Sequence, residues 1–206
     1  VIRRSYLTLK TVDLSAASNT ELPNGALAGC STMNSAALPS GLKIIGNRAL
    51  ADCRGLLNIS IPASVTTIND SAFINCIAIK TITFDGSSNP SQDVAHYAPT
   101  ASNQLKRIGN SAFYNCYKLN NLTIPAGVTE IGSSAFASCR SLKSVTLSDN
   151  ITAISNSLFF HCDSLQQIII PNSVTKIGSK AFYYCANLEH IVLGALVDTI
   201  DSGAFG

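Results

Sequence analysis

The sequence predicts an α/β solenoid, a right-handed superhelix with a parallel β-sheet on one face and short helical turns on the other. Three observations lead to this prediction. Seven cysteines recur at a fixed interval, apolar residues recur in phase with them, and a six-residue segment recurs once in each unit. Internal periods of roughly 20 to 50 residues are typical of stacked repeat architectures.

The cysteine positions define the repeat. Their separations are 23, 23, 40, 23, 23 and 23 residues, and the long gap equals one unit plus 17 residues, for Cys30, Cys53, Cys76, Cys116, Cys139, Cys162 and Cys185. Apolar residues follow each cysteine in phase, as Leu56, Ile59 and Ile61 follow Cys53. We therefore expect about eight copies of a 23-residue unit in a single domain that covers residues 1–206, with a degenerate first copy.

Each unit contains a segment with the pattern of a short strand. Ile59 and Ile61 alternate with Asn58 and Ser60, so the two pairs are expected to face opposite sides of a sheet. Most of the apolar residues in these segments are β-branched, which favours strands. Pro62 lacks the N–H that a ladder needs, so it is expected to end the strand.

The recurring six-residue segment predicts a helical turn. Its third residue is a good helix N-cap in every copy; these residues are Asn47, Asp70, Asn110, Ser133, Asn156, Ser179 and Ser202. Ala72, Phe73 and Cys76 would then lie on one face of the turn.

A single unit is too small to fold alone. Its few large side chains contribute roughly 2 kcal/mol each on burial, whereas ordering each residue costs about 1–2 kcal/mol. Neighbouring units must therefore stack. Because the last copy stops at Phe205-Gly206, just before its next cysteine, the chain is expected to be a fragment of a longer protein.

Composition excludes several classes of protein. Apolar residues make up 46% of the chain and charged residues 13%, which is too apolar for a disordered protein. The formal net charge is +2 and no basic run stands out, so no nucleic-acid partner is expected. No apolar stretch approaches the about 18 residues of a membrane span, so no direct membrane insertion is expected within this fragment.

The cysteines have two interpretations. They could form disulfides or a metal site, but their number is odd and no C-x-x-C pair is present. Free cysteine packs well as a small apolar residue, and one per repeat at an inward position predicts a buried structural column. We therefore expect no metal and no cofactor.

The outward strand residues are the first candidate binding site. By their phase they form one broad face, of the kind that solenoids use for binding: Asn58, Ser60, Thr81, Thr83, Asn121, Thr123, Ser144, Thr146, Gln167, Ile169, His190 and Val192. The alternative is that these residues serve strand propensity alone. The face lacks the Trp, Tyr and Arg that mark binding hot spots.

The insertion is the second candidate site. Residues 85–104 hold the 17 extra residues and are rich in Gly, Pro, Ser and Asn, with His96 and Tyr97 at the centre. A long loop on a rigid scaffold is a reasonable recognition element. A tolerated surface loop is the alternative interpretation.

No pattern indicates catalysis. His96, His161 and His190 stand in unrelated contexts, without the spacing of a metal site or a catalytic triad. The run His161-Cys162-Asp163 is interpreted as coincidental, because Cys162 is an inward repeat position. Glycosylation sequons begin at Asn58, Asn69, Asn121 and Asn150, and they can arise by chance in a sequence rich in Asn, Ser and Thr.

The motifs L-x-x-I-x-I-P and V-x-x-I-G-x-x-A-F-x-x-C resemble the BspA-like leucine-rich-repeat family, which includes Treponema-type surface proteins. The resemblance runs from about Leu9 to Phe205. It implies a secreted or cell-surface protein, adhesion to extracellular-matrix or other cell-surface proteins, and no shared catalytic residues. We therefore expect a non-catalytic recognition module; a stalk that projects another domain is the alternative.

Overall fold

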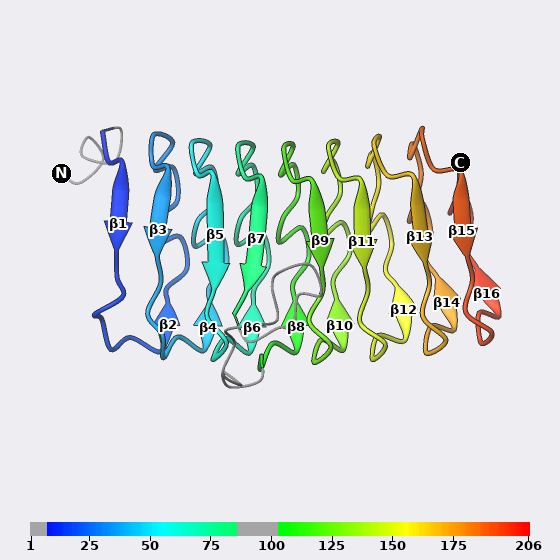
Figure 1. The fold of residues 1–206 in the computed structure, drawn as a ribbon, viewed down its shortest axis with the longest axis horizontal. Coiled ribbons are helices and arrows are strands. Elements are labelled where there is room, and N and C mark those ends of the chain that lie inside the picture. The colour runs from blue at the N-terminus through cyan, green and yellow to red at the C-terminus, as the bar shows by residue number, and fades with distance from the viewer. Residues whose placement is uncertain (1–7, 86–102) are drawn as a thin grey trace, which may run out of the picture.

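The computed structural model describes residues 8–85 and 103–206, and within them the chain forms a stack of repeats with two rows of parallel strands (Figure 1). Each repeat contributes one longer strand of three or four residues and one strand of two residues. The longer strands are β1 (Thr11–Asp13), β3 (Ser35–Ala37), β5 (Asn58–Ile61), β7 (Thr81–Phe84), β9 (Asn121–Thr123), β11 (Ser144–Thr146), β13 (Gln167–Ile169) and β15 (His190–Val192).

The two-residue strands form a second row that the sequence analysis did not predict. They pair in parallel in the orders β2-β4-β6-β8-β10 and β12-β14-β16. Their bounds are β2 (Glu21–Leu22), β4 (Ile44–Ile45), β6 (Thr67–Ile68), β8 (Arg107–Ile108), β10 (Glu130–Ile131), β12 (Ala153–Ile154), β14 (Lys176–Ile177) and β16 (Thr199–Ile200).

The strand register follows the sequence period. In the pair β5–β7, Asn58 lies opposite Thr81 and Ile59 opposite Ile82, an offset of one repeat. Thr67 of β6 lies opposite Arg107 of β8, across the 17 extra residues. The insertion therefore leaves the register of the stack unchanged.

The predicted alternation of the longer strands is confirmed. Ile59 and Ile61 are buried, whereas Asn58 and Ser60 are exposed. Strand β5 ends at Ile61, directly before Pro62, and the carbonyl of Pro62 accepts a bond from the amide of Val65 at 3.0 Å. Proline thus both ends the strand and begins the turn into the next one.

The predicted helical turns are wrong: the described residues contain no helix. In the segment after Ile68, the amides of Ala72, Ile74 and Cys76 bond to carbonyls three residues earlier. The amides that alternate with them, those of Ser71, Phe73 and Asn75, donate to carbonyls of the next repeat at 2.7–2.9 Å. This alternation directs half of the amides to the neighbouring repeat, so an i to i−4 helical ladder cannot form.

Left-handed backbone recurs at two positions of this turn segment. Ser71 and Asn75 have φ values of 56° and 61°, and their counterparts in the other repeats are also positive. Short polar residues and glycine tolerate this conformation better than bulky ones. The serines and asparagines at these two positions therefore suit the left-handed turn, although Arg48, His161, Lys180 and Tyr184 adopt it in other repeats.

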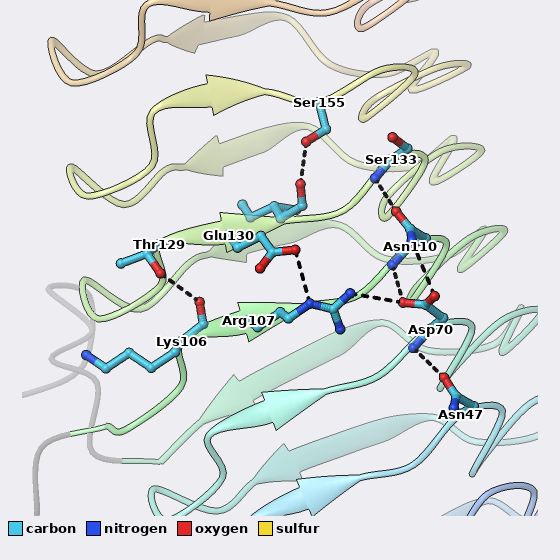
Figure 2. Close-up of polar contacts among 10 residues, drawn as sticks. Asn47, Asp70, Lys106, Arg107, Asn110, Thr129, Glu130, Ser133 and Ser155 are labelled. Atoms are coloured by element: carbon cyan, nitrogen blue, oxygen red, sulfur yellow. Dashed lines mark hydrogen bonds and ion pairs between the residues drawn. The ribbon is translucent and has the colours of Figure 1, made fainter.

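The residues expected to be helix N-caps instead support the next repeat. The Asn47 side-chain oxygen accepts a bond from the Asp70 amide at 3.1 Å, Asp70 accepts from the Asn110 amide at 2.9 Å, and Asn110 accepts from the Ser133 amide at 2.9 Å. Figure 2 shows this ladder. Arg107 lies beside it, between Asp70 at 3.4 Å and Glu130 at 3.1 Å.

The ladder accounts for most glycines at the second position of the recurring segment; Asn69, which follows Asn47, is the exception. A Cβ added at Gly132 would lie 2.5 Å from the Asn110 amide nitrogen and 2.7 Å from its side-chain oxygen. Where Ser133 replaces asparagine in the ladder, the next repeat carries Ser155 at the glycine position. The Ser155 hydroxyl donates to the carbonyl of Ile131 (Figure 2).

The interior consists of columns that run along the stack. Six phenylalanines, one per repeat, stack with ring-centroid separations of 4.9–6.0 Å: Phe73, Phe113, Phe136, Phe159, Phe182 and Phe205. Phe73 through Phe182 are buried. Each repeat therefore depends on its neighbours for burial, as the stacking argument requires.

The cysteines form a second column and are all free thiols. Each thiol from Cys53 onward donates to a carbonyl of the preceding repeat, as Cys139 does to Phe113 at 3.4 Å and Cys162 to Phe136 at 3.3 Å. Burial raises the pKa of the Cys139 thiol to about 12. A neutral thiol is unreactive, so the thiols whose pKa burial raises agree with the structural interpretation of the column; the pKa of Cys53 is instead lowered by a hydrogen bond with Cys76.

Candidate functional site

The candidate sheet face consists of the outward residues of the longer strands. Of the twelve positions named from the sequence, eleven are exposed and Thr123 is half-buried. The strands that carry them lie side by side in one row (Figure 1). The structure therefore gathers these residues on one surface, as their phase predicted.

The chemistry of the sheet face changes along the stack. From β5 to β11 it presents hydroxyl and amide groups, some of them bonded to one another: Ser144 donates to the side-chain oxygen of Asn121 at 2.8 Å, and Ser60 donates to Asp85. From β13 to β15 it becomes more apolar, because Ile169 is 68% exposed and Val192 is 58% exposed. The polar part, from β5 to β11, can form many modest hydrogen bonds along one side of a partner.

The insertion is closed at its base. The Asn103 side-chain amide donates to the carbonyl of Asp85 at 2.9 Å, and the Gln104 amide donates to Ala63 at 2.9 Å. The stack thus continues past the insertion as if it were absent. His96 and Tyr97, the candidate residues at its centre, lie outside the described residues.

The run His161-Cys162-Asp163 divides between the surface and the interior. His161 Nδ1 lies 3.1 Å from an oxygen of Asp163, and Arg140 Nε lies 3.8 Å from the other oxygen. Cys162 is buried and donates its thiol hydrogen to Phe136. The three side chains therefore do not converge on one point, as the sequence analysis expected. Residues 8–85 and 103–206 hold no group of three or more His, Cys, Asp or Glu that could ligate a metal.

The structure also brings together residues that the sequence analysis did not consider. A shallow depression of about 320 Å³ lies on the loops that precede β5, β7 and β9, and it is lined by Arg54, Ile77, Ala78, Asn115, Tyr117 and Lys118. We call the two residues after each cysteine, taken over all repeats, the turn edge. A usable signal was present in the sequence: cation, aliphatic, aromatic and cation occupy the position after Cys53, Cys76, Cys116 and Cys139.

Part of the exposed apolar surface lies in the last repeat. Leu193, Leu196 and Ile200 are 43%, 59% and 52% exposed.

Among the residues with a described structure, we find no helix with the length and hydrophobicity that a bilayer span requires.

The comparison with solved structures supports the repeat architecture. A leucine-rich-repeat protein of T. pallidum is 28% identical, with a TM-score of 0.73, over 88% of this chain and 78% of its own. The pneumococcal vaccine antigen PcpA is 22% identical with a TM-score of 0.57, over 91% of this chain and 51% of its own, which indicates a shared fold. A leucine-rich cell-surface protein of Faecalibacterium prausnitzii is 28% identical with a TM-score of 0.47, over 91% of this chain and 60% of its own.

A search of the curated proteins gave no match. The family comparison matched the BspA-type leucine-rich-repeat region over residues 5–101 and 96–206, which together span nearly the whole chain. The fold agrees with this family assignment, because the chain forms a β-solenoid of about eight turns with parallel strands. The chain belongs to the BspA-type leucine-rich-repeat family.

Proposed function

We propose that this protein is a non-catalytic recognition module of the bacterial cell surface that binds an extracellular-matrix protein or another cell-surface protein. The observation that carries the proposal is the division of each strand between two roles. Inward residues such as Ile59 and Ile82 are nearly the same from repeat to repeat, whereas the outward residues are exposed and vary. Variable side chains on an invariant, continuous scaffold are what solenoid binding surfaces present to a partner.

Family membership supports the cell-surface location and the adhesive role, because the BspA-type resemblance implies both. The face itself supports a protein partner. Its Thr, Ser and Asn side chains project from parallel strands about 4.8 Å apart, so they offer hydrogen bonds at a regular spacing over a long surface. Many modest contacts can add up to useful affinity without a single dominant hot spot.

The test is binding of the intact chain to a panel of immobilised extracellular-matrix proteins. We expect at least one to bind, and we expect the double substitution Thr81→Glu with Thr146→Glu to weaken binding by about tenfold or more, since it places charge on the interface. Thr152→Glu is the matched control, because Thr152 is exposed outside the row of longer strands. No binding to any member of the panel, or equal losses in both variants, would contradict the proposal.

A further inference from the structure

The residues that most often dominate protein interfaces lie away from the sheet face. Tyr, Trp and Arg are enriched at binding hot spots, and the outward positions of the longer strands in the described chain contain none of them. The turn edge contains Arg54, Tyr117 and Arg140, with side chains that are 61%, 46% and 46% exposed. The turn edge therefore offers stronger anchors than the face that the repeat pattern emphasises.

The residue directly after the cysteine, which is the first position of the turn edge, differs in type between successive repeats. Successive repeats place Arg54, Ile77, Tyr117 and Arg140 there, so an aliphatic and an aromatic side chain lie between two arginines. These loops stack directly: the Ser141 amide donates to the carbonyl of Tyr117 at 3.1 Å, and the Ser164 amide donates to Arg140 at 3.1 Å. Figure 1 shows them at the upper ends of the longer strands.

The surroundings of this row are basic. Lys118 lines the depression. Lys80 and Lys143 directly precede strands β7 and β11 in two of the same repeats. In these four repeats, the first, second and fourth positions after the cysteine hold five cations and no acid. Asp52 and Asp163 lie beside the two arginines, so cations outnumber acids here and the net positive charge is complementary to a negatively charged partner.

Both arginines retain donors for a ligand. Arg54 lies 3.8 Å from Asp52, and Arg140 lies 3.8 Å from Asp163. These separations exceed a hydrogen bond, so each guanidinium can still donate to a carboxylate through its five N–H groups. Within the described chain, Lys118 has no ion-pair partner within 4 Å.

The spacing of the row indicates the shape of the ligand. Three repeat steps of about 4.8 Å place Arg54 and Arg140 about 14 Å apart along the stack. An extended peptide advances about 3.4 Å per residue, so its first and fifth side chains are also about 14 Å apart and share one face. Its third side chain falls midway, over Ile77 and Tyr117.

We propose that the turn edge from Arg54 to Arg140 binds an extended acidic segment of a partner protein, with carboxylates at its first and fifth residues and an apolar or aromatic side chain at its third. The two arginines bind the carboxylates, Ile77 and Tyr117 pack against the central side chain, and Lys118 adds charge beside it. The inference rests on the proposed function, because it names a second contact surface and the partner chemistry for the same protein-binding role.

The experiment is an NMR titration of the intact chain with a capped pentapeptide, Glu-Ser-Tyr-Ser-Glu. We expect chemical-shift changes centred on Ile77, Tyr117 and Lys118, with an affinity in the millimolar range that falls as salt is added. Tyr117→Ser should weaken binding about fivefold or more, and Arg54→Ala or Arg140→Ala about two- to fivefold each. Lys106→Ala, an exposed lysine of the turn before β8, is the control and should change affinity by less than about twofold.

Two comparisons make the result decisive. A peptide of the same composition with adjacent glutamates, Ser-Glu-Glu-Ser-Tyr, should bind more weakly if the spacing matters. A sulfated oligosaccharide that binds the same residues more tightly, with no effect of Tyr117→Ser, would show a general polyanion site and overturn the inference. Shift changes confined to Thr81 and Thr146 of the sheet face, or no changes at all, would also overturn it.

Failure here is distinguishable from failure of the proposed function. If the peptide does not bind while the intact chain still binds a matrix protein through the sheet face, the turn-edge inference is wrong and the recognition role stands. If the matrix panel is also negative, both are wrong.

Discussion

The interior and the exterior of this solenoid follow different rules, although the same 23-residue units build both. Inside, nearly every repeat places the same residue type at the same level, which produces the phenylalanine and cysteine columns. Outside, one position holds Arg54, Ile77, Tyr117 and Arg140 in turn. The repeated interior residues therefore determine the scaffold. The exposed positions that vary between repeats are available to determine what the scaffold binds.

The largest expected difference between the two regions is in stability. Phe159 and Phe160 are neighbours in the sequence, but Phe159 is buried in the column whereas Phe160 is half-buried and stacks on Tyr183 at 6.0 Å. We expect Phe159→Ala to lower the free energy of unfolding by about 3–5 kcal/mol, because it leaves a cavity. Phe160→Ala should cost about 1 kcal/mol. Urea denaturation measures both, and equal losses would remove the distinction between column and surface.

The asparagine ladder gives the next largest effect. Gly132→Ala would force a Cβ to within 2.5 Å of the Asn110 amide nitrogen, so we expect a loss of about 1–3 kcal/mol. Gly41→Ala is the matched control, because an added Cβ there meets nothing within 4 Å, and its effect should stay within about 0.5 kcal/mol. Thermal unfolding of the two variants provides the measurement. If Gly41→Ala proved as costly, the glycine pattern would have a cause other than the ladder.

The cysteine column predicts a dependence on alkaline pH. Burial raises the pKa of Cys139 from its ordinary value of 9.0 to about 12, so the folded state retains a proton that the unfolded state loses. The contribution to stability is therefore complete below pH 9.0 and is lost as the pH rises toward 12. The slope is about −1.4 kcal/mol per pH unit for each such thiol. Cys139→Ala should flatten the alkaline arm of the stability curve, and an unchanged arm would contradict the assignment.

The smallest expected effects on stability are on the sheet face. Thr81→Ala and Thr146→Ala remove exposed side chains and should change the free energy of unfolding by less than about 0.5 kcal/mol. Binding to a matrix protein should nevertheless weaken, since contact area is lost. The informative quantity is the difference between the two effects, measured by urea denaturation and by a binding assay on the same preparations. A stability loss that matched the binding loss would mean that the face is structural.

The burial pattern could be predicted from the sequence because burial repeats. Ile59, Phe73 and Cys76 recur in phase, and all three are buried. The turn conformation could not be predicted in the same way. Ala72, Phe73 and Cys76 have the spacing of a helix face, and the polar residue before them suits an N-cap. The amides of Ser71, Phe73 and Asn75 bond instead to the next repeat, and no local signal reveals a partner so distant in the sequence.

The candidate sites show the same division. The sheet face was predictable, because strand alternation fixes which side chains point outward. The short strands such as Thr67–Ile68 were not predicted, since two residues are too few to show a period. The turn edge was missed because Arg54, Ile77 and Tyr117 do not repeat, and a search for recurring residues passes over such a position.

The accessibility of the cysteines tests the stacked architecture most directly. Six thiols, from Cys30 to Cys162, are fully buried, whereas Cys185 is half-buried. In a timed thiol-labelling experiment on the native protein, we expect Cys185 to react first and the other six to remain protected until the chain unfolds. Rapid labelling of several of these six thiols without denaturant would show that the column is not buried, and the stacked interior would then be wrong.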